Sequence, residues 1–277
     1  PAGSGGMSSS TWGQGWYDRF PMAPLRDALT DTPFDNLRQG MAAFSSRGPC
    51  RDGRVKPDIV APGTDIISCR SRMPGASELW GTGAGVLANG ASNFYAFCGG
   101  TSMSTPLVAG AAVLARQYLV ENRGIASPGA ALIKALMAAG ARTLSPGQYG
   151  TGAAREIPIG QRPNNHEGWG HINLGDTLFP GGNGTNILVD GLSLSAGQVY
   201  SYTYTPSASN RASIALAWSD YPASPLAAAS LVNDLDLAVV TPDHEIIYPN
   251  GLSGPDRTNN LELIDLDPAA AGGSYLV

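Results

Sequence analysis

The chain has 277 residues, which is long enough for one large domain or two moderate ones. Apolar residues make up 43% of it and charged residues only 14%, with a net charge of −5, so a substantial core can form. No basic run indicates a nucleic-acid partner, and no apolar stretch of about 18 residues indicates a membrane span. The low charge and the scarcity of lysine suit a secreted protein.

The first hundred residues predict loops and short strands. Residues 1–35 show no clear period and are expected to be mainly loops. Residues 41–49 and 58–61 are predicted as short strands, because apolar residues run between prolines and turn residues. Residues 65–70 and 94–98 are predicted as two further strands on either side of a glycine-rich loop.

Three cysteines cannot all pair within one chain. If the strands at 65–70 and 94–98 form an antiparallel hairpin, Cys69 and Cys98 come within range of a disulfide that would brace the turn after them. Two small buried thiols in the hairpin are the alternative. A disulfide would leave Cys50 without a partner.

Residues 99–106 (Gly-Gly-Thr-Ser-Met-Ser-Thr-Pro) precede a run of small and apolar residues at 107–119. This pattern predicts a tight turn that places the Ser102 hydroxyl in the first turn of a helix buried on nearly every side. The first N–H groups of a helix lack intrahelical partners, so an oxyanion forming beside Ser102 would meet donors already in place. Pro106 suits a first helical turn. For a lone Gly-Thr-Ser, an ordinary helix N-cap is the alternative.

A second helix is predicted at 129–141, and the pattern changes after residue 180. Short alternating segments bounded by turn residues then predict an all-β sandwich. They lie at 186–189, 198–205, 212–218, 231–240, 245–248, 261–264 and from 274 onward. We therefore predict two domains, at 1–180 and at 184–277.

Residues 99–106 resemble the serine signature of the subtilisin-like serine proteases, the subtilases, and depart from its commonest form only at Ser104, where alanine is usual. Residues 44–49, 56–63 and 168–174 resemble three further blocks of this family, in the family's order. The resemblance implies the C-terminal half of an α/β catalytic domain built on a parallel sheet.

The same resemblance implies roles for single residues. Ser102 would be the nucleophile, with Gly100 and Thr101 shaping its loop, and the Ser102 backbone N–H would be one oxyanion donor. The blocks at 44–49 and 56–63 would be scaffold that positions the serine turn.

Residues 232–237 and 256–262 resemble the C-terminal β-domain of one subtilase branch, which has a jelly-roll fold. Asp234 and Asp236 share the polar face of a strand there. They are candidate ligands of a structural Ca²⁺ ion, and solvated charges or turn anchors are the alternative.

The family's catalytic Asp, His and oxyanion Asn blocks have no counterpart in the chain. His166, His171 and His244 lie in polar segments and are expected to be solvated or structural. We therefore expect these blocks before Pro1, and a chain that is a fragment, truncated at both ends and inactive alone.

The expected parent is a secreted, monomeric endopeptidase that cleaves proteins or peptides through an acyl-enzyme on Ser102, with no cofactor for catalysis. A non-catalytic pseudoprotease or binding module is the first alternative. The second is a separate jelly-roll binding chain that carries a remnant of a protease.

Overall fold

The structure is a computed structural model that describes residues 40–42, 44–63, 66–73, 94–147, 151–153, 155–160, 162–180, 186–205, 212–266 and 273–277. Three predicted features fall wholly or mainly on residues that the structure does not describe. They are the loops at 1–35, the glycine-rich loop between the strands at 65–70 and 94–98, and the domain boundary at 180–184. The chain forms two compact units, each made of segments distant in sequence. One takes in the described residues up to Ser46, Val60–Val108 and Leu144–Ile159, and the other Arg47–Ile59, Ala109–Thr143 and Gly160–Val277.

In the first unit, β1 (Ile66–Cys69) and β2 (Tyr95–Cys98) form the predicted antiparallel hairpin. The strands predicted at 41–49 and 58–61 do not form, and these segments run as loops with isolated bridge residues at most. Their apolar residues are nevertheless buried, in a small core made of Met41, Val60, Leu144 and Ile157. An apolar run between prolines is thus buried here although it forms no strand within the described residues.

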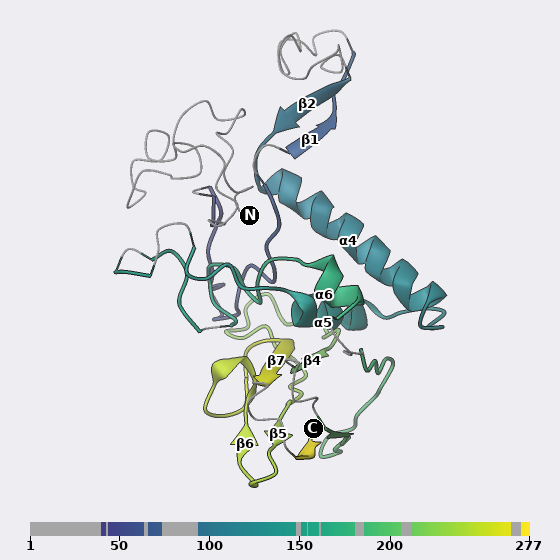
Figure 1. Cartoon of the computed structure of the whole chain (residues 1–277). Coiled ribbons are helices and arrows are strands. Elements are labelled where there is room, and N and C mark those ends of the chain that lie inside the picture. The colour runs from purple at the N-terminus through teal and green to yellow at the C-terminus, as the bar shows by residue number, and fades with distance from the viewer. Residues whose placement is uncertain are drawn as a thin grey trace. The chain divides into compact units, whose positions relative to one another are not determined.

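Helix α4 spans Thr101–Glu121, close to the predicted 101–119 (Figure 1). The prediction that it is buried on nearly every side is wrong for the described structure. A single stripe is buried, whereas Val113 is 65% exposed and Leu114 is 49% exposed. The stripe consists of Ser104, Ala111, Ala115 and Leu119. Pro106 lies inside the helix, beyond its first turn, where it removes the N–H that would bond to the Ser102 carbonyl.

Helices α5 (Ala130–Gly140) and α6 (Leu174–Leu178) belong to the second unit. The helix predicted at 129–141 thus forms as α5, in which Leu132, Leu136 and Met137 are buried and Ile133 packs against the cluster that contains Leu132 and Leu136. The Asn173 side chain caps α6 by accepting a hydrogen bond from the Asp176 N–H. None of the described helices is long and apolar enough to cross a membrane.

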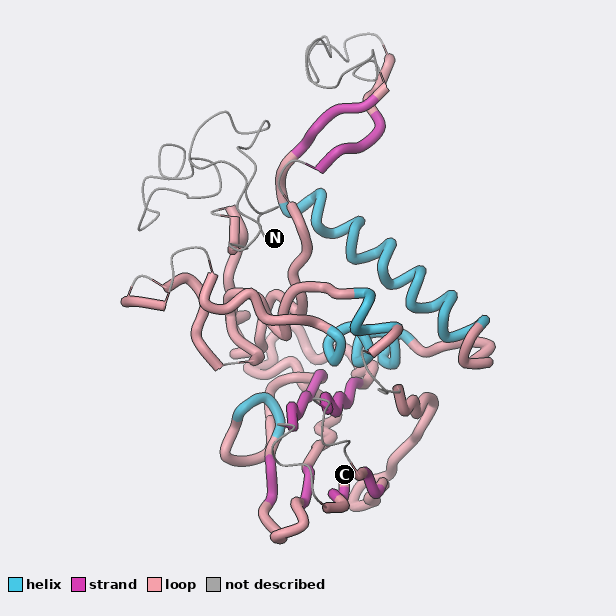
Figure 2. Tube along the Cα trace, in the orientation of Figure 1, coloured by secondary structure: helices cyan, strands magenta, loops and turns pink. Residues whose placement is uncertain are grey.

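Six of the seven predicted β segments contain a strand, and only 186–189 does not. The strands are β3 (Thr203–Tyr204), β4 (Ala212–Ala217), β5 (Val239–Val240), β6 (Ile246–Ile247), β7 (Leu261–Leu266) and β8 (Tyr275–Leu276). They form one sheet of order β3-β8-β5-β6 and a second sheet of β4 and β7. Every pair of described strands is antiparallel, so the predicted parallel sheet is not among the described residues. Long loops join the short strands (Figure 2).

Strand β7 separates two apolar clusters because its side chains alternate between the faces of the sheet. Leu261 and Leu263 pack with Ala138 of α5 and with Trp169. Ile264 and Leu266 pack on the other face, in a cluster that includes Leu237, Val239 and Tyr275. The positions of Glu262 and Asp265 in this alternation decide their surroundings, as described below.

Candidate functional site

The turn before Ser102 is tied to the segment that ends at Gly63. The Gly100 N–H donates to the Gly63 carbonyl at 2.7 Å, and the Gly100 carbonyl accepts from the Met103 N–H at 3.1 Å. Gly100 has a φ of +150°, which side chains with a Cβ rarely adopt. Gly63 and Ala61 are both buried. The geometry supports the scaffold role that we expected for residues 56–63.

Ser102 is exposed at the start of α4. Its N–H is among the first four of the helix, which have no intrahelical acceptor. Its side chain makes no hydrogen bond to any residue in the described part of the chain. The hydroxyl therefore lies free at the positive end of a helix dipole, where a negative charge would be stabilised.

The neighbouring hydroxyl groups are engaged differently. The Thr105 hydroxyl donates to the Thr101 carbonyl at 3.0 Å, so Thr101 contributes its backbone to the first turn. Ser104 is only 8% exposed, and its Oγ has no hydrogen-bond partner among the described residues. The Thr101 and Ser102 side chains are both exposed and make no hydrogen bond to the described residues, whereas the Ser104 side chain is buried and the Thr105 hydroxyl is engaged.

The three histidines differ in burial: His166 and His171 are partly buried, and His244 is exposed. Burial, and to a smaller extent the charge of Arg47, lowers the pKa of His166. Burial lowers the pKa of His171, whose backbone pairs with Arg142. His244 is exposed in the turn between β5 and β6, with a φ of +63°. Each is therefore neutral or solvated, as the sequence indicated.

The suggested disulfide between Cys69 and Cys98 is not formed, and both cysteines are free thiols, as is Cys50. In the hairpin register Cys69 lies opposite Tyr95, and Cys98 lies opposite Ile66. The two cysteines therefore sit at opposite ends of the four-residue ladder, about 10 Å apart along the strands, too far for a disulfide. The alternative of two buried thiols is not met either, since Cys69 is exposed and Cys98 is only partly buried.

The predicted calcium ligands Asp234 and Asp236 share a cation from within the chain. Arg257 Nη1 lies 2.5 Å from Asp234 Oδ2 and 2.9 Å from Asp236 Oδ1. Within the described residues, no group of three or more His, Cys, Asp or Glu side chains could hold a metal ion. The Arg257 guanidinium therefore bridges the two carboxylates that are the candidate calcium ligands.

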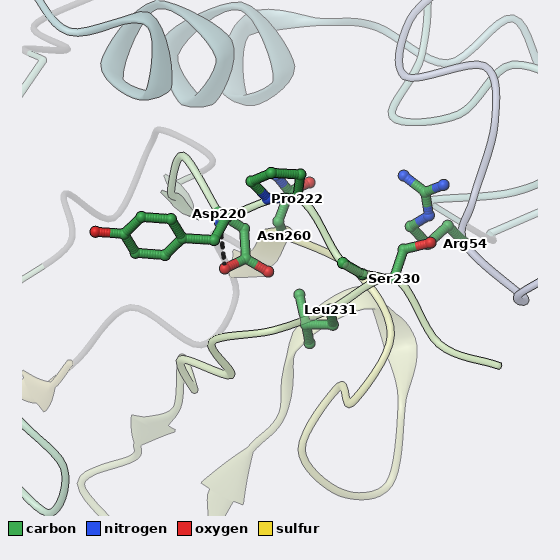
Figure 3. Close-up of a pocket in the computed structure, with 8 residues that line it drawn as sticks. Arg54, Asp220, Pro222, Ser230, Leu231 and Asn260 are labelled. Carbon is green, nitrogen blue, oxygen red and sulfur yellow. Dashed lines mark hydrogen bonds between the residues drawn. The ribbon is translucent and has the colours of Figure 1, made fainter. Parts of the chain in front are cut away.

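A polar pocket of 230 Å³ lies in the second unit, between the segment at Arg54 and the loops at 220–223 and 230–231 (Figure 3). Asp220 accepts hydrogen bonds there from the N–H groups of Tyr221, Val232 and Asn233. Burial raises its pKa, but these donors outweigh burial and leave the pKa lowered. Its oxygens thus hold loop backbone, and the described residues that line the pocket include no histidine.

Glu262 and Arg257 are the residues that sequence reasoning overlooked. Both lie in the segment 256–262, which resembles the β-domain of one subtilase branch. The usable signal was an acidic residue in the middle of the apolar strand Leu-Glu-Leu-Ile at 261–264.

Known proteins similar to this chain are serine proteases. The chain is 33% identical over 302 residues to "Serine protease/ABC transporter B family protein tagB" of Dictyostelium discoideum, an alignment that covers 88% of this chain and 16% of that protein. It is 43% identical over 77 residues to "Serine protease AprX" of Bacillus subtilis, with 28% of this chain and 16% of that protein covered. A "C5a peptidase" of Streptococcus pyogenes is 42% identical over 79 residues, with 28% and 5% covered. The chain thus spans about one sixth or less of the length of these relatives.

The family model agrees with the motifs. The Subtilase family matches residues 15–170, which is 156 of the 277 residues and includes both the serine turn and the Gly-Trp-Gly turn. This chain belongs to the subtilase family of serine proteases.

Proposed function

We propose that Ser102 is the nucleophile of a subtilisin-class endopeptidase. Its Oγ attacks the carbonyl carbon of a peptide bond, its proton passes through a base to the leaving amine, and the resulting ester is hydrolysed by water. The catalytic Asp and His and an oxyanion Asn come from outside these 277 residues, so the chain alone does not hydrolyse peptides. In the longer protein the substrates are proteins or peptides.

The single observation that carries this proposal is the free hydroxyl of Ser102 on the first turn of α4. The helix is long, at 21 residues, and its serine turn is held by the bond from Gly100 to Gly63. A serine held in a fixed turn, with a backbone N–H of its own that has no intrahelical acceptor, is the geometry that acyl transfer needs.

The exposed side of α4 supports the second part of the proposal. Leu107, Val113 and Leu114 are exposed there, and a Cβ on Gly110 would meet nothing within 4 Å. Apolar surface of this kind on one long helix needs a covering partner. We assign that role to the remainder of a subtilase catalytic domain, which would also bring the base to Ser102.

The remaining parts of the proposal rest on composition and strand pattern. The low content of charged residues and lysine supports a secreted enzyme that acts outside the cell. The two antiparallel sheets formed by β3 to β8 support a jelly-roll domain after residue 184.

The test compares two lengths of the same protein. The 277-residue chain is assayed with a peptide ester, and so is the chain joined to the preceding part of its own reading frame. We expect no turnover by the first. We expect turnover by the second, together with labelling of Ser102 by a fluorophosphonate, located by mass spectrometry.

Ser102→Ala is the control in both lengths. Turnover by the short chain that this variant abolishes would refute the claim that the base lies elsewhere. A longer protein that folds but neither reacts nor becomes labelled would favour the pseudoprotease, whose Ser102 has no base to activate it.

A further inference from the structure

Four carboxyl groups of the β-rich part form what we call the acidic cluster: Asp234, Asp236, Asp256 and Glu262. The cluster joins the segment before β5 to the turn before β7 and to β7 itself. The charges of all three aspartates act on Glu262 and disfavour its ionisation. The buried members of such a cluster must be neutralised by a metal ion, by a basic side chain or by protons, whereas the exposed carboxylates can also be solvated.

The outer part of the cluster is neutralised by Arg257. Its Nη1 contacts Asp234 Oδ2 at 2.5 Å and Asp236 Oδ1 at 2.9 Å. Both carboxylates thus share one guanidinium, which comes from the turn that precedes β7. A bridging cation is already present without any bound ion.

The inner part of the cluster has no such partner. Glu262 is 0% exposed and lies on the face of β7 that packs against Leu237 and Val239. Its Oε2 accepts a hydrogen bond of 2.6 Å from the Leu237 N–H. Its Oε1 has no hydrogen-bond partner among the described residues, and the residue opposite it on β4 is Leu216.

The charged groups nearby are committed elsewhere. The Asp256 carboxylate accepts from the N–H groups of Thr258 and Asn259 and from the Asn250 side chain. On the other elements, Lys134 of α5 pairs with Asp58, and Arg162 pairs with Asp265 on the opposite face of β7. Because an unpaired carboxylate in an apolar core is very costly, Glu262 must hold a proton.

We propose that the acidic cluster is neutralised from within, by the Arg257 guanidinium on Asp234 and Asp236 and by a proton on Glu262, and that it therefore binds no calcium.

The titration of Glu262 agrees with this geometry. Burial, and to a smaller extent the neighbouring aspartates, raises its pKa to about 8, although the Leu237 N–H acts in the opposite direction. The folded chain then keeps a proton that the unfolded chain releases near the ordinary pKa of 4.5. The stability from this proton is complete below pH 4.5 and is lost as the pH rises toward 8.

The first experiment measures unfolding of the 277-residue chain by denaturant from about pH 5 to pH 9. In the wild type, Glu262 is expected to raise the unfolding equilibrium constant by up to about tenfold per pH unit below its pKa. Glu262→Gln should lack this component, whereas the exposed matched control Glu245→Gln should follow the wild type. Equal pH slopes in the wild type and in Glu262→Gln would overturn the proposal.

Infrared spectroscopy gives a readout that does not depend on the stability of a variant. The wild type at about pH 6 should show the carbonyl band of a protonated carboxylic acid, although exposed carboxyl groups are ionised at that pH. The band should disappear above about pH 8. Its absence at pH 6 would contradict a protonated Glu262, even if Glu262→Gln fails to fold.

A calcium titration tests the last part of the proposal, that the acidic cluster binds no calcium. The thermal midpoint of the wild type should be the same in millimolar Ca²⁺ and in a chelator. A calcium-dependent rise in the midpoint that is lost in Asp234→Asn would show that the cluster binds the ion, and would overturn the proposal.

Discussion

The serine turn of α4 and the centre of β7 each carry a polar group without a hydrogen-bond partner in the described part of the chain, and the two groups differ in exposure. The Ser102 hydroxyl is exposed, so water can satisfy it and it costs no stability. Glu262 Oε1 is buried among apolar residues, where the same lack of a partner is costly.

The comparison shows why one site is available for chemistry and the other is not. An exposed hydroxyl at a helix N-terminus can accept a substrate and a base from elsewhere. A buried carboxyl responds to its surroundings by keeping its proton. The serine turn is thus incomplete in a way that a partner can remedy, whereas the acidic cluster is complete within the chain.

The largest expected effect is the loss of catalytic activity when the Ser102 hydroxyl is removed. In the longer protein, Ser102→Ala should lower kcat on a peptide substrate by on the order of 10⁴-fold or more, because the nucleophile is removed. Ser104→Ala is the matched control, since Ser104 lies two residues further along α4 but is buried. Steady-state kinetics on both variants checks this, and an equal loss in both would point to a folding defect instead.

The next largest effect is on the free energy of unfolding, and it compares a buried leucine of β7 with an exposed leucine of α4. Leu261→Ala at the start of β7 removes a side chain packed against Trp169, and should lower the free energy of unfolding by about 2–5 kcal/mol. Leu114→Ala on the exposed side of α4 should cost less than about 1 kcal/mol in the 277-residue chain. Denaturant unfolding measures both. A large loss in Leu114→Ala would mean that this side of α4 is covered.

The smallest expected effects are changes in stability of opposite sign when Gly100 or Gly110 is replaced by alanine. Gly100→Ala forces a Cβ onto a backbone with a φ of +150° and should destabilise the chain by about 1–3 kcal/mol. Gly110→Ala has open space and sits in the helix, so it should stabilise the chain by about 0.5–1 kcal/mol. Thermal unfolding distinguishes the two signs. Destabilisation by Gly110→Ala would mean that another segment packs closely on that position.

Local pattern predicted the elements well. The turn at Gly100, the helices α4 and α5 and the strand β7 all formed close to the expected residues, because each depends on neighbouring residues in sequence. The predictions that failed concerned contacts between segments distant in sequence, namely strand pairing and cysteine pairing. Residues 58–61 form a bridge at most and no strand within the described residues, and the register of β1 and β2 separated Cys69 from Cys98.

The sequence by itself determined the family, since four ordered blocks around Ser102 need no coordinates to be recognised, and it marked Ser102 as the candidate nucleophile. Only the tertiary structure decided that one stripe of α4 is buried, that Arg257 holds Asp234 and Asp236, and that Glu262 is enclosed. Helix and turn signals arise within a few residues of chain. Burial and ion pairing arise from segments far apart in sequence, and their positions are set only when the chain packs.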